Sequence, residues 1–178
     1  MGIKQSVREV FFQLRLHMPW LSYEERFRFF EVDPGKLFRS SQPTPPALDY
    51  FMAHYHIRSL IILREKGDEK EIAHAKSCGL KICHIPIKHH TSPTETDVKK
   101  FFDFLSDKIN RPALVHCLQG RDRTGYLCFV YRIEEMGWTT NDAWEEMKKF
   151  GFFSLPWHNR TQGHIKELIE QQYNRKFE

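Results

Sequence analysis

The chain has 178 residues, a length typical of one domain, and 40% hydrophobic and 28% charged residues, as in an ordinary globular protein. Its formal net charge of +4 is too small to indicate nucleic-acid binding by itself, but it suits an anionic small substrate. No stretch predicts a membrane-spanning helix, and the four cysteines form no CxxC pair, which argues against a zinc ribbon. We therefore expect a cytoplasmic protein with reduced thiols that binds no nucleic acid.

Residues 1–30 are predicted to form a helical extension that precedes a main domain over residues 31–178. Residues 3–17 carry apolar side chains at helical spacing, which favours an amphipathic helix packed on the domain. The alternative is a peripheral membrane anchor, because the segment is also basic and "MGIKQS" fits the myristoylation pattern. A second helix is expected over residues 22–30.

Strands and helices alternate through the rest of the chain. We expect strands at "GKLFRS", "RSLIILR", "LKICHIPI" and "PALVHC", and helices over residues 45–55, 65–79, 97–109, 123–137, 139–151 and 161–175. This alternation predicts an α/β fold: one domain with a central four- or five-stranded, mainly parallel sheet and helices on both faces. Ligands of such sheets bind beyond the carboxyl ends of the strands, which is where "PALVHC" places Cys117.

The residues after Cys117, "LQGRDRTG", run from this strand into a helix. Backbone N–H groups of such a loop cradle an oxyanion, and the helix N-terminus adds the positive end of its dipole. Arg123 offers a planar fork for two phosphate oxygens. The same groups favour the thiolate of Cys117, which makes it a nucleophile aimed at phosphorus. The residues expected to bind phosphate are Leu118, Gln119, Gly120, Arg121, Asp122 and Arg123.

The predicted reaction is attack of Cys117 on a phosphomonoester, which gives a phosphocysteine that water then hydrolyses. Thr124 can donate a hydrogen bond to the sulfur and help it leave in the second step. We expect His116 to orient the loop through hydrogen bonds to backbone groups. Cys128 is interpreted as a small buried hydrophobic residue.

The stretch "HCLQGRDRTG" resembles the HCxxGxxR[ST]G signature of the cysteine-dependent protein tyrosine phosphatase superfamily. "GKLFRSSQP" with "IRSLIILRE" is similar to compact dual-specificity phosphatases, and "YRIEEMGWTTNDAWEEMKKFGF" to their bacterial members. The chain also looks like the plant and fungal atypical dual-specificity phosphatases, which act on inositol pyrophosphates. This resemblance implies the dual-specificity phosphatase fold and an enzyme without metal or cofactor, in which Cys117 is the nucleophile and Arg123 the phosphate clamp.

The general acid departs from the family pattern. Most members carry an aspartate on a separate loop, where this chain has His89 or His90. We rank Asp122 first, because members that end in "DRT", including the myotubularin-type lipid phosphatases, have an acid assigned there. A bound dianion beside Asp122 would raise the pKa of its carboxyl group. His89 or His90 ranks second and Asp97, which reads more simply as a helix N-cap, ranks third.

Two substrate classes stay open. Cations that could converge on the pocket favour inositol phosphates or phosphoinositides: Arg64, Lys66, Lys88, His89, His90 and Arg121. An aromatic wall would instead suit a phosphotyrosine protein, within a wider class that includes phosphoserine proteins. The candidates for that wall are Phe152, Phe153, Trp157 and His158.

Two alternatives to this enzyme remain. A pseudophosphatase would bind phosphorylated ligands with negligible turnover; the intact Cys117 and Arg123 argue against it, while the uncertain acid keeps it open. A rhodanese-like sulfurtransferase also uses a loop cysteine, but the "HC" start and the "RTG" ending of this loop disfavour it.

Overall fold

The structure is a computed structural model that describes residues 3–88, 91–152 and 160–173. A five-stranded sheet forms its centre, in the order β1-β2-β5-β3-β4. The strands are β1 (Phe30–Asp33), β2 (Leu37–Ser40), β3 (Ser59–Arg64), β4 (Lys81–Ile87) and β5 (Ala113–His116). β1 runs antiparallel to β2, and the other neighbouring pairs are parallel. The predicted α/β fold with a mainly parallel sheet is confirmed.

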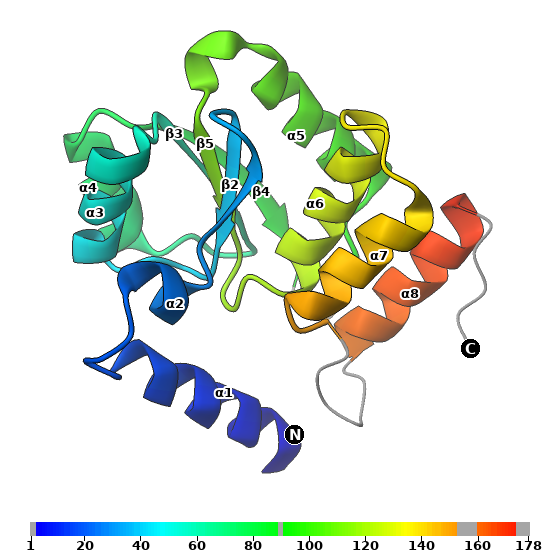
Figure 1. Cartoon of the computed structure of the whole chain (residues 1–178), viewed down its shortest axis with the longest axis horizontal. Helices are drawn as coiled ribbons and strands as arrows, with labels where there is room; N and C mark the ends of the chain where they lie inside the picture. The colour runs from blue at the N-terminus through cyan, green and yellow to red at the C-terminus, as the bar shows by residue number, and fades with distance from the viewer. Residues whose placement is uncertain (1–2, 89–90, 153–159, 174–178) are drawn as a thin grey trace.

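Helices cover both faces of this sheet (Figure 1). They are α1 (Ile3–Leu16), α2 (Tyr23–Phe27), α3 (Pro45–Tyr55), α4 (Glu69–Ser77), α5 (Glu95–Ser106), α6 (Asp122–Glu134), α7 (Thr140–Lys149) and α8 (Arg160–Gln172), with a 3-10 turn at Lys108–Asn110. Two apolar clusters lie on opposite faces: α2, α3 and α4 pack on one, and α5 to α8 on the other. In β3, Leu60 and Ile62 join the first cluster and Ile61 and Leu63 the second, as expected of a strand buried on both sides.

The predicted helix over residues 22–30 is wrong beyond Phe27. Ser22 and Glu25 form a capping box at the start of α2. Arg28 then adopts the left-handed conformation, with φ 53°, and the chain enters β1. Pairing of β1 with β2 outweighs the local helical pattern, since it satisfies the backbone of an edge segment.

Helix starts also differ from the predicted ones. The segment predicted as a helix over residues 65–79 becomes helical at Glu69, because Asp68 caps the N–H groups of Lys70 and Glu71. Thr139 is the N-cap of α7, so this helix begins at Thr140, one residue after the predicted start.

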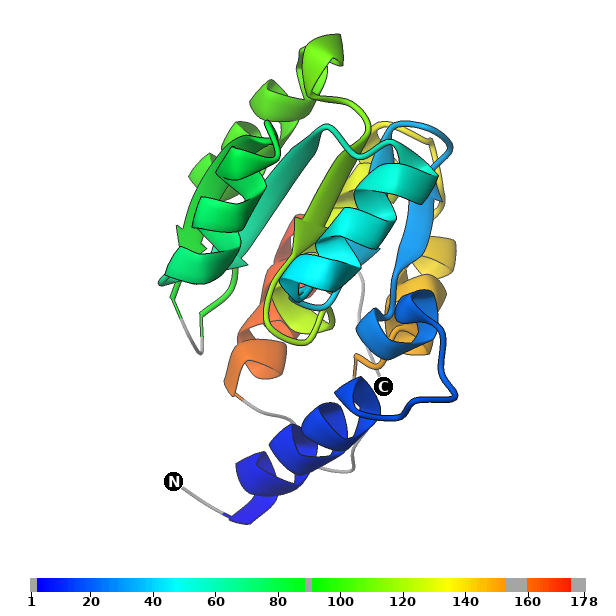
Figure 2. The ribbon, with the colours of Figure 1, turned by 90° about the vertical axis from the view of Figure 1, so that its left-hand side faces the viewer.

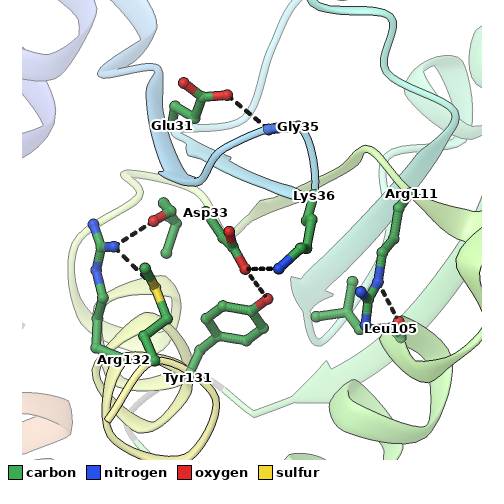
Figure 3. A network of polar contacts seen from close by, with 10 residues as sticks. Glu31, Asp33, Gly35, Lys36, Leu105, Arg111, Tyr131 and Arg132 are labelled. Atoms are coloured by element: carbon green, nitrogen blue, oxygen red, sulfur yellow. Dashed lines mark hydrogen bonds and ion pairs between the residues drawn. The ribbon is translucent and has the colours of Figure 1, made fainter. Parts of the chain in front are cut away.

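Side chains of α6 fasten the β1–β2 hairpin to the domain (Figure 3). The Asp33 carboxylate accepts hydrogen bonds from the Tyr131 hydroxyl at 2.7 Å and the Lys36 ammonium at 3.0 Å. Arg132 donates to the carbonyl of Val32 and pairs with Glu146 of α7. The hairpin and the two helices therefore form one packed unit, and β2 is held firmly in the sheet.

Helix α1 packs through part of its surface. Phe12 is buried, while Val10, Phe11 and Leu14 are exposed. Figures 1 and 2 show α1 below the carboxyl edge of the sheet, on the side where α6 begins. None of the helices in the described ranges is long and apolar enough to cross a membrane. The membrane-anchor alternative for α1 stays a prediction.

Candidate active site

The loop between β5 and α6 is seated against the end of β2. Cys117 follows β5 directly and is 3% exposed. The backbone N–H of Gln42 donates to the carbonyl of Leu118 at 3.1 Å. Gly120 has a φ of +66°, and a Cβ there would lie 2.5 Å from the Ser40 carbonyl oxygen. Only glycine fits this position, so the curl of the loop depends on its contact with β2.

A buried arginine supports the loop from β2. Arg39 is 1% exposed, and its Nη2 donates to the Gly120 carbonyl at 2.7 Å. Its guanidinium lies 4.0 Å from the centre of the Phe150 ring, within the range of a cation–π contact. This fixed cation adds positive potential beneath the loop. This support was not predicted from the sequence; the signal was an arginine directly after two apolar residues, Leu37 and Phe38, of a predicted strand.

Arg123 stands where the phosphate clamp was predicted, in the first turn of α6. Its Nη1 donates to the carbonyls of Leu63 at 3.2 Å and Ile87 at 3.0 Å. These bonds anchor the guanidinium at the carboxyl ends of β3 and β4. No hydrogen bond joins its Nη2 or Nε to another residue in the described part of the chain. The fork can therefore offer two nitrogens to a phosphate, as the prediction requires.

Thr124 lies one residue further along α6 and is fully buried. Its Oγ1 has no hydrogen-bond partner among the described residues. Buried hydroxyls normally have a partner, which a thiolate or a bound phosphate would supply. The predicted hydrogen bond from Thr124 to the sulfur of Cys117 agrees with this and stays a prediction.

A buried histidine and glutamate lie behind the thiol. His116 Nδ1 is 3.1 Å from the Cys117 carbonyl oxygen, so the predicted hydrogen bond of His116 to a backbone group is confirmed, and its role in orienting the loop stays a prediction. His116 Nε2 is 3.2 Å from Glu71 Oε1, in a contact that falls short of hydrogen-bond geometry. Burial lowers the pKa of His116 to about 4 and raises the pKa of Glu71 to about 8. Both side chains are therefore neutral near pH 7, and Nδ1 carries the proton that it donates to the carbonyl.

A polar chain continues from Glu71 to the end of β3. Gln42 Nε2 donates to Glu71 Oε2 at 3.3 Å, and Arg64 Nη1 donates to Gln42 Oε1 at 2.5 Å. Arg64, a predicted substrate cation, is thus engaged in supporting this chain. Glu71 was also missed by the sequence analysis. The only signal was its position four residues before the buried Ala75 on the inner face of α4.

Asp122, the first-ranked general acid, begins α6. Its Oδ1 accepts a hydrogen bond at 2.8 Å from Nε2 of Gln162, a fully buried residue of α8. This contact helps to orient the carboxyl group at the start of α6. Gln162 is far away in the sequence, and no local pattern indicated it.

The other candidates for the general acid, and the neighbouring Lys88, lie outside the loop after Cys117. Asp97 is the third residue of α5, where its Oδ2 accepts from Thr94 N and Oγ1, each at 2.8 Å. The predicted N-cap role is thus wrong in detail, because Thr94 is the N-cap and Asp97 completes a capping box. His89 and His90 lie outside the described residues. Lys88 is exposed at the end of β4, so its contact with substrate stays a prediction.

The predicted aromatic wall is wrong for Phe152. Its side chain is 1% exposed and packs edge-on against Trp144 in the core, so it cannot face a substrate. The other three candidates lie outside the described residues: Phe153, Trp157 and His158. Cys128 is fully buried, and burial raises the pKa of its thiol to about 11, as expected of an inert core residue.

The structure thus has a thiol at the end of a parallel strand, a loop curled against a buried arginine, and an anchored arginine at the start of the next helix, an arrangement that suits a cysteine nucleophile beside a bound phosphoryl group. The comparisons with known proteins agree. The sequence matches the tyrosine phosphatase family over residues 25–174, and the chain belongs to this family.

Curated relatives include inositol diphosphatases. The chain is 29% identical over 128 residues to inositol diphosphatase DSP4 of Arabidopsis thaliana, which covers 68% of this chain and 63% of the relative. It is 23% identical over 124 residues to inositol diphosphatase SIW14 of Saccharomyces cerevisiae, covering 66% of this chain and 43% of the relative. The chain thus spans about half the length of these relatives.

Solved structures show the same fold. The catalytic core of the S. cerevisiae SIW14 phosphatase aligns with a TM-score of 0.67 at 21% identity, over 82% of this chain and 92% of that chain. The P. aeruginosa protein TpbA aligns with a TM-score of 0.65 at 22% identity, over 79% of this chain and 84% of that chain. At this level of identity the likeness supports the fold.

Proposed function

We propose that this protein is a metal-independent phosphatase that hydrolyses phosphomonoesters through a phosphocysteine at Cys117. The observation that carries the proposal is the loop that joins β5 to α6. This loop begins at Cys117, curls at Gly120 against β2, and ends at Arg123, whose guanidinium is anchored on β3 and β4. A phosphoryl group in this loop would receive hydrogen bonds from the backbone N–H groups of residues 118–123 and from Arg123.

Two displacements complete the proposed reaction. The Cys117 thiolate attacks phosphorus, the bond to the leaving oxygen breaks, and Asp122 gives that oxygen its proton. Water then attacks the phosphocysteine and gives a proton back to Asp122, while the S–P bond breaks and the thiolate returns. Thr124 stabilises the departing sulfur with a hydrogen bond.

The proposed substrates are inositol phosphates or phosphoinositides, ahead of phosphotyrosine or phosphoserine proteins. The support is the presence of inositol diphosphatases among the relatives and the burial of Phe152, which removes one residue of the predicted aromatic wall. Arg121, a residue of the loop itself, contributes a further positive charge next to the cradle.

Phosphate release from a panel of substrates tests the proposal. The panel contains an activated aryl phosphate, phosphotyrosine and phosphoserine peptides, inositol hexakisphosphate and phosphoinositides, with Cys117→Ser beside the native protein. Turnover that requires Cys117 and is fastest on inositol substrates is expected. A native protein that binds phosphate and turns over none of these substrates would be a pseudophosphatase, and persulfide formation with thiosulfate would indicate a sulfurtransferase.

The role of Asp122 has its own test. Asp122→Asn is expected to slow hydrolysis of alkyl phosphates about a hundredfold or more, because a poor leaving group needs the proton. Activated aryl phosphates should keep most of their rate. Gln162→Leu, which removes the hydrogen bond to Asp122, should give a smaller loss with the same dependence on leaving group. Equal losses on both substrates would reject Asp122 as the acid.

A further inference from the structure

A basic cavity of about 430 Å³ lies beside the phosphate loop, between the N-terminal helices and the end of α7. Four cationic and two acidic side chains line it, which gives a formal charge of +2: Arg15, Arg28, Arg121, Lys149, Glu24 and Glu25. Arg121 is also part of the loop that follows Cys117. The cavity and the phosphate cradle therefore share one residue as a common wall.

Two of the arginines converge on Gly151. A Cβ on Gly151 would lie 3.0 Å from Arg121 Nε and 3.1 Å from Arg28 Nη1. Arg28 Nη1 also lies 3.3 Å from the Phe150 carbonyl, to which it donates. The two guanidinium groups therefore lie close together, and both contribute positive charge to the same part of the cavity. The absence of a side chain at residue 151 is what admits both guanidinium groups.

The two glutamates of the cavity take hydrogen bonds from groups that do not line it. Glu24 Oε1 accepts from the hydroxyls of Tyr50 at 2.9 Å and Tyr55 at 2.7 Å. Glu25 Oε2 accepts from the backbone N–H of Ser22 at 2.9 Å, in the capping box of α2. Their charge is thus directed toward α3 and the start of α2, and the cationic groups dominate the cavity.

The first helix completes this arrangement. Arg15 Nε donates to the Glu25 carbonyl at 2.7 Å, which ties α1 to α2 next to the cavity. The placement of α1 below the carboxyl edge of the sheet in Figures 1 and 2 brings Arg15 to the same side as the catalytic loop. The N-terminal segment, for which the sequence indicated no catalytic role, is therefore part of the site's surroundings.

We propose that this cavity is a second anion subsite, which binds a non-reacting phosphoryl group while the Cys117 loop holds the reacting one. The inference rests on the proposed function and specifies its substrate: a small molecule with two or more phosphoryl groups on one compact scaffold. Arg121 joins the two positions, since its backbone belongs to the cradle and its guanidinium to the cavity. A substrate with a single phosphoryl group would occupy the cradle alone.

Binding measurements on the Cys117→Ser protein test the subsite without any need for turnover. The probes are inositol hexakisphosphate and inorganic phosphate, measured by calorimetry at constant ionic strength. Lys149→Gln should weaken hexakisphosphate binding about fivefold, equal to about 1 kcal/mol, and the ratio of the two affinities should fall by a similar factor. Lys148→Gln is the matched control: it is the neighbouring exposed lysine of α7, pairs with Glu145 at 2.7 Å, and does not line the cavity.

Each outcome decides the proposal. A fall in the affinity ratio in Lys149→Gln and Arg28→Gln, with none in Lys148→Gln, supports the subsite. Equal losses in Lys149→Gln and Lys148→Gln would show a general effect of surface charge and overturn it, as would equal weakening of both probes in Lys149→Gln. The proposed function is tested separately, by phosphate release. If the native protein releases no phosphate, the proposed function fails, but the binding measurements still test the subsite.

Discussion

The two regions on either side of Arg121 are built in different ways. The catalytic loop is held from the interior: by the buried Arg39 of β2, the carbonyls of Leu63 and Ile87, and the buried His116. The basic cavity is held by partly exposed side chains on α1, α2 and the end of α7. The difference indicates that the reaction is determined by rigid packing, whereas the choice of ligand depends on surface charges that can change at little cost to the fold. Substitutions on the loop side should therefore cost rate or stability, and substitutions on the cavity side should change selectivity.

The largest effect is expected at the nucleophile. Cys117→Ser should lower the turnover rate about ten thousandfold or more, because a hydroxyl in the same place is not ionised near neutral pH. Urea unfolding should show a free energy close to that of the native protein, since the change is nearly isosteric. If Cys117→Ser keeps substantial activity, the nucleophile is another residue, and the loop after Cys117 is not the catalytic region in the comparison with the basic cavity.

Arg39 tests whether the loop depends on its buried support. Arg39→Lys should lower kcat at least about tenfold and the free energy of unfolding by about 2 kcal/mol, because lysine lacks the planar group that faces both Gly120 and Phe150. The control is Arg58→Lys, at an exposed position. If the two variants behave alike, the loop keeps its shape without Arg39.

Glu71 makes the free energy of unfolding depend on pH. The folded state holds the Glu71 proton up to about pH 8, while the unfolded state releases it near the ordinary value of 4.5. Stability from this group is therefore present at low pH and lost as pH rises through the folded pKa. His116 is neutral in both states only above about pH 7.5, and below that pH its contribution is common to the native protein and to a variant changed only at Glu71.

Between pH 6.5 and pH 8 the native protein should thus lose about 1 kcal/mol per pH unit relative to Glu71→Gln, within the limit set by one proton. Urea unfolding of both proteins across this window measures the difference. Parallel pH profiles would mean that Glu71 is ionised in the folded protein.

Gly151 provides the smallest and most selective test, on the cavity side. Gly151 and Gly137 have positive φ values of 93° and 67°, so alanine at either position costs about 1 kcal/mol of strain. Only at Gly151 would the new Cβ meet the two arginines, since a Cβ at Gly137 has nothing within 4 Å. Gly151→Ala should therefore weaken inositol hexakisphosphate binding about threefold beyond Gly137→Ala. If both variants weaken hexakisphosphate binding equally, the two arginines beside Gly151 do not contribute to binding.

Much of the fold was predictable because its signals are local. The buried strand at residues 59–64 appeared as a continuous apolar run, and the capping and glycine patterns indicated the approximate ends of several helices. β1 was not predictable from such signals, because an edge strand of four residues exists only through its pairing with β2. The local pattern of the preceding residues continued to favour a helix.

The sequence by itself determined the catalytic chemistry proposed here, since Cys117 and Arg123 stand at a fixed spacing in one continuous loop. Only the tertiary structure decided what surrounds that loop. Arg39, Glu71 and Gln162 come from three separate elements and meet the loop through packing. The basic cavity likewise joins α1, α2 and the end of α7. Periodicity and motifs report neighbours along the chain, whereas these contacts join residues far apart in sequence, whose proximity depends on how helices pack on the sheet.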